Sequence, residues 1–332
     1  MVDLIATTPG LLPLPDWAKD ELSTLKGHQK SDLIDGGEGP TVSGVYDRVR
    51  QELVDAQLSA GIDHIGEGQA RWDDMLAHPL VMADGVETRG IVRYYDNNNF
   101  YREPVITDAL EPSGDVGAEL AETDTEGRPV QTVLPGPYSL FDLATDEYYQ
   151  DRTDCLAAVA ELLAAEIEQL PDHETLFLLE PSLVENPPTD EFAAAASQAI
   201  DRVADATAAS VVVHTYFGAI PEEAYAHLMD ASVDAIGFDF VTDHESTLYN
   251  IQEYGTKSRI ALGVVDGQNT LVESPAAIDD RVDWVREQLP GESFDTIYVT
   301  SNTELLYLPM NKAIAKLEAL GATVAADTEV SA

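Results

Sequence analysis

The stretch Val211-Val-Val-His-Thr-Tyr-Phe-Gly218 indicates how the rest of the chain folds. Three consecutive valines, followed by further β-forming residues, predict a buried strand over residues 210–216. This strand brings a histidine, an aromatic residue and a glycine to its carboxyl end, where parallel-sheet proteins hold their functional groups. Of the seven histidines, only His214 stands near the end of so apolar a strand. His214 is therefore the first candidate for a functional side chain.

Similar short apolar runs alternate with helical periodicity along the whole chain. The expected strands span residues 3–8, 63–67, 130–134, 175–180, 210–216, 235–240, 259–266 and 296–301. Eight alternating units favour a (β/α)8 TIM barrel over an open doubly wound sheet, and no GxGxxG or Walker-type phosphate loop supports the open sheet. The fold class predicted is thus α/β, and we expect residues 1–332 to form a single barrel domain.

Three segments interrupt this alternation. Residues 90–107 have β-rich arms around an Asn-rich turn, which predicts a β-hairpin inserted into the barrel. The acidic run from Glu111 to Arg128 is expected to be a solvated linker. A polar, Gly-rich loop is expected at about residues 26–41.

The formal net charge is −43, from 18 basic and 61 acidic residues. Nucleic acid and anionic membrane surfaces both require cationic patches, so we expect neither as a partner. The carboxylates are spread over the whole chain instead of forming a tail. This distribution favours a hydrated acidic surface on a halophilic, cytoplasmic protein over a polyvalent metal-binding tail.

The single cysteine, Cys155, excludes a disulfide within the chain and any cysteine-based metal cluster. It falls in an amphipathic helical pattern and is expected to be a small core residue. The sequence shows no apolar run typical of a signal peptide or a membrane span.

Carboxylates follow several of the expected strands, and each has a functional and a structural interpretation. Glu67 either contacts the amino group of a substrate or caps the next helix or pairs with Arg71. Glu180 is a catalytic candidate, because a carboxylate at the rim of a barrel is costly to bury without a partner. Asp239 and Asp266 either bind a cation or amine or cap the helix that follows, and Asp266, in Val-Asp-Gly, has the character of a turn residue.

Five segments, in this order along the chain, resemble the cobalamin-independent methionine synthase family within the wider uroporphyrinogen-decarboxylase-like barrels. The segments are Pro135-Gly-Pro137, Leu179-Glu-Pro181, His214-Thr-Tyr-Phe-Gly218, Leu262-Gly-Val-Val-Asp-Gly-Gln-Asn269 and Leu305-Leu-Tyr-Leu-Pro309. In that family, the C-terminal of two homologous barrels holds zinc on His, Cys, Glu and Cys and activates homocysteine for methylation by methyltetrahydrofolate. Three pieces are similar to the N-terminal, zinc-less barrel: Tyr95-Asp-Asn-Asn98, Thr215-Tyr-Phe-Gly218 and Gly263-Val-Val-Asp-Gly-Gln-Asn269. Ile65-Gly-Glu-Gly68 is similar to the catalytic barrel.

The resemblance also implies a set of site residues. Matched strand by strand, His214 takes the place of the zinc-binding histidine, Tyr216 and Thr303 the places of the two cysteines, and Asp239 the place of the glutamate. A zinc site that activates a thiolate needs soft or imidazole ligands, so the ligand set is degraded and His214 is the one metal ligand retained. The resemblance implies His214, Glu180 and Asp239 as catalytic residues. The candidates for substrate binding are Glu67, Asp266, Tyr216 and Thr303. The first two are carboxylates at strand ends, and the last two occupy the places of the cysteines.

The function implied by the resemblance is S-methyl transfer in methionine biosynthesis, from a methyltetrahydrofolate-type donor to homocysteine, together with a separate zinc-bearing paralogous barrel. The alternative is a non-catalytic subunit that binds a pterin or substrate or regulates a methionine synthase. A decarboxylase of the wider barrel group would need arginines at the rim, and the candidates Arg93, Arg102 and Arg259 do not lie at the carboxyl end of an expected barrel strand.

Overall fold

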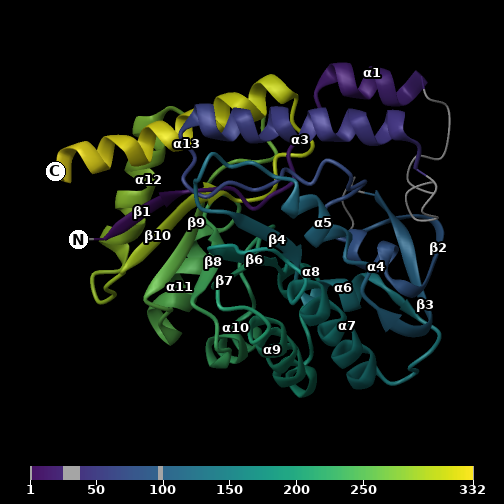
Figure 1. Ribbon diagram of the computed structural model, residues 1–332. Coiled ribbons are helices and arrows are strands. Elements are labelled where there is room, and N and C mark those ends of the chain that lie inside the picture. The colour runs from purple at the N-terminus through teal and green to yellow at the C-terminus, as the bar shows by residue number, and fades with distance from the viewer. Residues whose placement is uncertain (1, 25–37, 96–99, 332) are drawn as a thin grey trace.

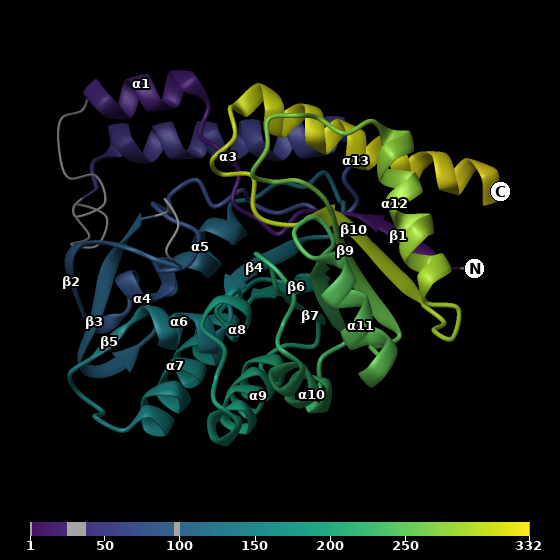
Figure 2. The same ribbon diagram turned by 180° about the vertical axis from the view of Figure 1, so that it is seen from behind.

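The computed structural model of the protein describes residues 2–24, 38–95 and 100–331. Seven parallel strands form a curled sheet in the order β1-β10-β9-β8-β7-β6-β4, and helices surround it (Figures 1 and 2). The strands are β1 (Asp3–Ala6), β4 (Gln131–Pro135), β6 (Thr175–Leu179), β7 (Ser210–His214), β8 (Ala235–Asp239), β9 (Arg259–Val265) and β10 (Thr296–Ser301). The α/β class and seven of the expected strand positions are confirmed.

The strand expected at residues 63–67 is present only as one bridge residue. Ile65 pairs in parallel with Val130, donating its N–H to Pro129 O and accepting from Gln131 N–H, both at 2.9 Å. On the other side, Asp63 N–H donates to Ala6 O at 2.9 Å. A five-residue strand was wrong here, because the main-chain N–H and C=O of Gly66 pair with the side chain of Gln57, at 3.1 and 2.8 Å, instead of with a neighbouring strand. Closure into a complete (β/α)8 barrel stays a prediction.

A smaller sheet lies beside the curled one, at the right of Figure 1. In it, β2 (Asp84–Arg93) and β3 (Phe100–Glu111) pair antiparallel, and β5 (Thr145–Asp146) adds to β3 in parallel. The antiparallel pair extends beyond the expected 90–107. Residues 96–99, where the turn was expected, lie outside the described residues, as does most of the expected loop at 26–41.

The helices are α1 (Asp16–Thr24), α3 (Pro40–Ala60), α4 (His78–Met82), α5 (Asp115–Ala121), α6 (Pro137–Leu143), α7 (Arg152–Ile167), α8 (Ser182–Glu185), α9 (Asp190–Ala204), α10 (Glu222–Asp230), α11 (His244–Tyr254), α12 (Pro275–Gln288) and α13 (Met310–Ser331). The expectation of a solvated linker at 111–128 was wrong, because α5 lies within it and buries Val116 and Leu120. Among the residues described, no helix combines the length and apolar character that crossing a membrane requires.

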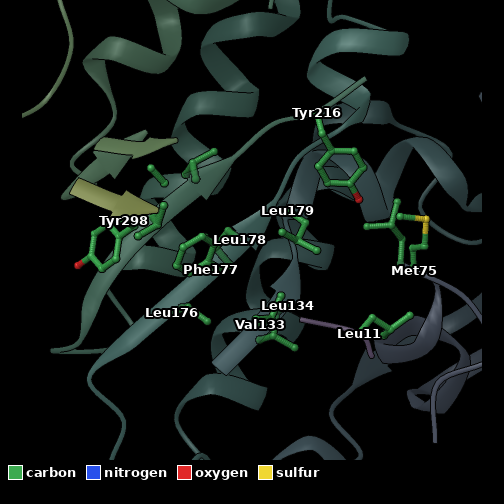
Figure 3. Packing of buried hydrophobic residues seen from close by; sticks show 14 of the residues in the cluster. Leu11, Met75, Val133, Leu134, Leu176, Phe177, Leu178, Leu179, Tyr216 and Tyr298 are labelled. Atoms are coloured by element: carbon green, nitrogen blue, oxygen red, sulfur yellow. The ribbon is translucent and has the colours of Figure 1, made fainter. Parts of the chain in front are cut away.

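The packed interior follows the pattern of apolar runs. Val212 and Val213 of β7 are fully buried, as the valine run predicts. Figure 3 shows Phe177, Leu178 and Leu179 of β6 in the interior between Tyr298 on one side and Tyr216 on the other. Cys155 is buried in α7, and burial raises the pKa of its thiol to about 12. Its assignment as a small core residue is confirmed.

Candidate functional site

The carboxyl ends of β7, β8 and β10 meet in a buried polar network centred on Asn302. The Asn302 side-chain oxygen accepts from the N–H groups of Gly267 and Thr303, each at 2.9 Å, and its amide nitrogen donates to Asp239 Oδ2 at 3.1 Å. Its main-chain oxygen accepts from His214 Nε2 at 2.8 Å. Asn302 therefore brings together three of the predicted site residues.

His214 is fully buried at the end of β7. Because Nε2 donates to a carbonyl, the other ring nitrogen, Nδ1, is the unprotonated acceptor of the neutral ring. Nδ1 has no hydrogen-bond partner in the part of the chain described, and it lies against Gly237, where an added Cβ would be 2.3 Å away. Burial lowers the pKa of His214, with the Asn302 carbonyl and Asp239 opposing. The ring is neutral at pH 7.

Asp239 uses both carboxylate oxygens within the protein. Oδ1 accepts from the N–H groups of Val241 and Thr242, at 2.9 and 2.8 Å. Oδ2 accepts from Phe217 N–H, Thr242 Oγ1 and Asn302 Nδ2, at 3.1, 2.7 and 3.1 Å. The side chain thus orders the turn after β8 and ties it to the loop after β7.

Glu180 lies at the end of β6 and caps the amino end of α6. Oε1 accepts from Tyr138 N–H at 2.9 Å, and Oε2 accepts from Ser139 N–H at 2.7 Å and from its hydroxyl at 2.6 Å. Gly136 makes room for the carboxyl group, since an added Cβ would be 2.2 Å from it. Burial raises the pKa of Glu180 to about 7, although these hydrogen bonds oppose the shift.

Glu67 lies near charged side chains of α3 and α5, among them Arg50 and Glu119. Burial, together with the negative charge of Glu119, raises the pKa of Glu67 to about 8 against the opposing effect of Arg50. The Arg71 guanidinium pairs with Glu119 at 2.8 Å.

Asp266 and Thr303 both have local hydrogen bonds. Asp266 Oδ1 accepts from Gln268 N–H at 3.0 Å, the geometry of the turn residue that the Val-Asp-Gly sequence suggested. Thr303 Oγ1 donates to the main-chain oxygen of Glu304 at 3.1 Å. Thr303 shares the network through Asn302, whereas Asp266 shapes the loop after β9.

The Tyr216 side chain contacts Glu304, a residue that the sequence did not identify as a candidate. Both side chains are buried, and the Tyr216 hydroxyl donates to Glu304 Oε1 at 3.0 Å. Glu304 Oε2 is buried without a hydrogen-bond partner among the described residues. Burial raises the pKa of Glu304 to about 8, Tyr216 opposes this, and Asp74 adds to it. The carboxyl group is therefore protonated at neutral pH.

Aromatic residues from the end of β2 cover the carboxyl end of β7. The ring of Tyr95 lies 5.9 Å from that of Phe217, which in turn is 4.7 Å from Tyr216. Tyr94 packs on Tyr95 at 5.1 Å between ring centres, and the Tyr95 hydroxyl lies 2.7 Å from Ser182 Oγ. The small sheet thus contributes an aromatic wall to the site.

A surface groove of about 870 Å³ lies between α10 and α11. Its walls include acidic side chains such as Glu222 and Glu245, together with Tyr249. The Asn302 network does not line this groove, so the two features are separate.

The four positions that resemble zinc ligands do not fit a zinc ion. Asp239 has its oxygens filled by five donors, the Tyr216 hydroxyl donates to Glu304, and Thr303 Oγ1 donates to a main-chain carbonyl. The free nitrogen of His214 lies against main chain at Gly237. Across residues 2–24, 38–95 and 100–331, no group of three or more His, Cys, Asp or Glu side chains is placed to hold a metal ion.

Relatives of known name have similar sequences. Methionine synthase of Saccharolobus solfataricus is 22% identical over 321 residues, which cover 95% of this chain and 92% of the relative. The 5-methyltetrahydropteroyltriglutamate–homocysteine methyltransferase of Streptococcus sanguinis is 29% identical over 203 residues, which cover 60% of this chain and 26% of that protein. The chain therefore spans nearly the whole of one relative and about a quarter of the other.

A solved structure and a family model agree with these relatives. A B12-independent methionine synthase from Shewanella sp. W3-18-1, in complex with selenomethionine, has the same fold, with a TM-score of 0.78, 20% identity and coverage of 98% of this chain and 97% of that one. The family model described as "Cobalamin-independent synthase, N-terminal domain" matches residues 81–289. The chain belongs to the cobalamin-independent methionine synthase family.

Proposed function

We propose that the protein acts in methionine biosynthesis as one barrel of a two-barrel S-methyltransferase, which transfers a methyl group from a methyltetrahydrofolate-type donor to homocysteine. The separate, zinc-bearing barrel activates the homocysteine thiol. The observation that carries this division of labour is the internal hydrogen bonding of the four zinc-ligand positions, which leaves no set of donors free for a metal. The match to an N-terminal-domain family model supports the same assignment.

The chain's own residues hold and orient ligands in this scheme. Asn302, His214 and Asp239 fix the loops at the carboxyl edge of the sheet, which gives a bound molecule a rigid floor. The rings of Tyr95 and Phe217 offer flat apolar faces, the surface on which a pterin ring stacks. The solved relative is in complex with selenomethionine, which supports a methionine-like amino acid as the second ligand.

We also propose that residues 1–332 form one domain in which the Ile65 bridge closes the curled sheet. The hydrogen bonds of Asp63 to β1 and of Ile65 to the β4 side support this closure. A closed sheet would place the Asn302 network at the carboxyl mouth of a barrel, the face on which barrel enzymes bind their substrates.

Turnover by the purified chain tests the proposal. The chain alone, with homocysteine, methyltetrahydrofolate and zinc, is expected to form no methionine. Methionine is expected to form once the zinc-bearing barrel is added. Metal content is measured on wild type, His214→Ala and His244→Ala, the last being an exposed histidine of α11 and the matched control.

Turnover by the chain alone would overturn the two-barrel arrangement, above all with stoichiometric zinc that His214→Ala removes and His244→Ala retains. If methionine formed in neither case and the chain still bound methyltetrahydrofolate, the alternative of a non-catalytic pterin-binding subunit would replace the proposal.

A further inference from the structure

Glu304 differs from the other buried carboxylates of the site in its hydrogen bonding. Asp239 and Glu180 have both oxygens hydrogen-bonded within the protein. In Glu304 only Oε1 is paired, with the Tyr216 hydroxyl, and Oε2 is buried with no hydrogen-bond partner among the described residues. An unpaired buried polar atom costs free energy, and folded proteins retain few of them. The Oε2 atom therefore has an acceptor position that a hydrogen-bond donor of a ligand would satisfy.

The main chain around Glu304 is held in place from several directions. Thr303 donates to the Glu304 main-chain oxygen at 3.1 Å, and Asn302 binds the N–H groups of Thr303 and Gly267. Gly267 packs so closely that an added Cβ would lie 2.9 Å from the Glu304 main-chain oxygen. The main chain that carries the Glu304 side chain is therefore already ordered, and ligand binding would order little additional backbone.

The surroundings of Glu304 combine negative charge with aromatic rings. The buried Asp74 contributes to the raised pKa of Glu304. Burial raises the pKa values of Tyr94 and Tyr307, and the nearby Asp74 and Glu304 contribute to both shifts. Tyr307 is 49% exposed, whereas Tyr94 and Tyr216 are buried. Aromatic faces and a carboxylate are the groups that attract an organic ammonium ion.

We propose that Glu304, oriented by Tyr216, is a subsite that binds the ammonium group of the amino-acid ligand, with Oε2 as the acceptor and the neighbouring tyrosine rings around the cation. The identity of that ligand, homocysteine or methionine, rests on the proposed function. The subsite itself rests on the unpaired oxygen, the fixed main chain and the aromatic surroundings.

Binding at this subsite has a measurable proton balance. The free protein holds a proton on Glu304 at pH 7, because burial raises its pKa to about 8. When the ammonium group arrives, the carboxyl group loses its proton to solvent, the ammonium keeps its own protons, and an ion pair forms. Binding at pH 7 therefore releases up to about one proton per ligand.

Calorimetric titration of the full chain at pH 7, in two buffers of different ionisation enthalpy and at constant KCl, tests the subsite. L-Methionine is expected to bind with proton release, and 4-(methylthio)butanoate, which lacks the amino group, is expected to bind about 10–100-fold more weakly with no release. Glu304→Gln is expected to weaken methionine binding by about 10–100-fold and to abolish the proton release. Tyr216→Phe is expected to weaken binding less and to keep the release.

Glu287→Gln, which removes one exposed carboxylate on α12, is the matched control and is expected to change neither quantity. Near-UV circular dichroism checks that each variant is folded. The subsite is wrong if wild type binds no methionine, if it binds both compounds equally well, or if Glu304→Gln releases as many protons as wild type.

The titration and the turnover assay separate the two proposals. Proton release that depends on Glu304, without turnover in the presence of the zinc-bearing barrel, would leave the subsite standing and remove the proposed function. Turnover that is unchanged in Glu304→Gln would leave the function standing and remove the subsite.

Discussion

At the scale of single residues, burial affects the carboxyl groups of the site in different ways. Glu180 has three hydrogen bonds from α6, and burial raises its pKa only to about 7. Glu304 has one hydrogen bond from another side chain, and its pKa rises to about 8. The difference follows from the number of donors that stabilise the charged form.

The raised pKa of Glu304 predicts an unusual dependence of stability on pH. Between its unfolded pKa near 4.5 and its folded pKa of about 8, the folded state holds a proton that the unfolded state has lost. The free energy of unfolding contributed by this group therefore falls as pH rises through that window, by up to about 1.4 kcal/mol per pH unit. Glu304→Gln removes this contribution, so its stability should fall less steeply than that of wild type.

Urea unfolding at constant KCl, measured from about pH 5 to about pH 8, gives both slopes. Glu287→Gln again serves as the control and should retain the wild-type slope. Equal slopes for Glu304→Gln and wild type would contradict the raised pKa.

The sequence predicted where several site residues lie but not which groups they contact. His214, Asp239 and Thr303 were expected at one edge, and the structure joins them through Asn302. Asn302 and Glu304 were missed because they follow the last β-forming residues of β10 in a short polar segment with no recognisable spacing. Their burial depends on the approach of β7 and the small sheet, which are distant in the sequence.

At the scale of secondary-structure elements, the contact between Glu180 and α6 depends on one glycine. Gly136 has φ −76° and ψ 161°, a conformation that alanine also adopts, so only the space beside Glu180 requires glycine. Gly136→Ala should displace the carboxyl group from the amino end of α6 and lower the free energy of unfolding by about 1–3 kcal/mol.

Gly44→Ala is the matched control for this prediction. Gly44 lies within α3 with no atom within 4 Å of an added Cβ, so alanine there should raise the free energy of unfolding by about 0.5–1 kcal/mol. Urea unfolding measures both variants. If both substitutions were stabilising, the tight packing of Gly136 on Glu180 would be refuted.

Element prediction succeeded where local pattern and tertiary structure agree. The Val211–Val213 run became β7, and Leu176–Leu179 lies in β6. It failed at residues 63–67, where the Gln57 side chain occupies the main-chain groups of Gly66, and at α5, where an acidic surface concealed the buried Val116 and Leu120. Burial of a few apolar residues on a mostly acidic segment is a tertiary effect that composition does not reveal.

At the scale of the whole molecule, the net charge of −43 governs the response to salt. Carboxylates that repel one another in the folded state are screened at high ionic strength, because the Debye length falls from about 10 Å at 0.1 M salt to about 3 Å at 1 M. The Tm should therefore rise by several degrees between about 0.1 M and about 2 M KCl. Differential scanning calorimetry measures this change.

A Tm that is constant or falls with KCl would contradict the prediction of a salt-adapted surface. Potassium sulfate at equal, low ionic strength is the control, since screening alone should give the same shift for both anions, whereas preferential exclusion would favour sulfate.

Because Ile65 forms only a single bridge, we expect the sheet to open more readily between β1 and β4 than between β8, β9 and β10. Few main-chain hydrogen bonds join this segment to β1 and β4, whereas β8, β9 and β10 pair along most of their length. Amide hydrogens at Ile65 and Gln131 should therefore exchange with deuterium through local openings, while those of β9 wait for global unfolding. We therefore expect local openings to be concentrated between β1 and β4, where the Ile65 bridge lies, while the Asn302 network keeps its geometry.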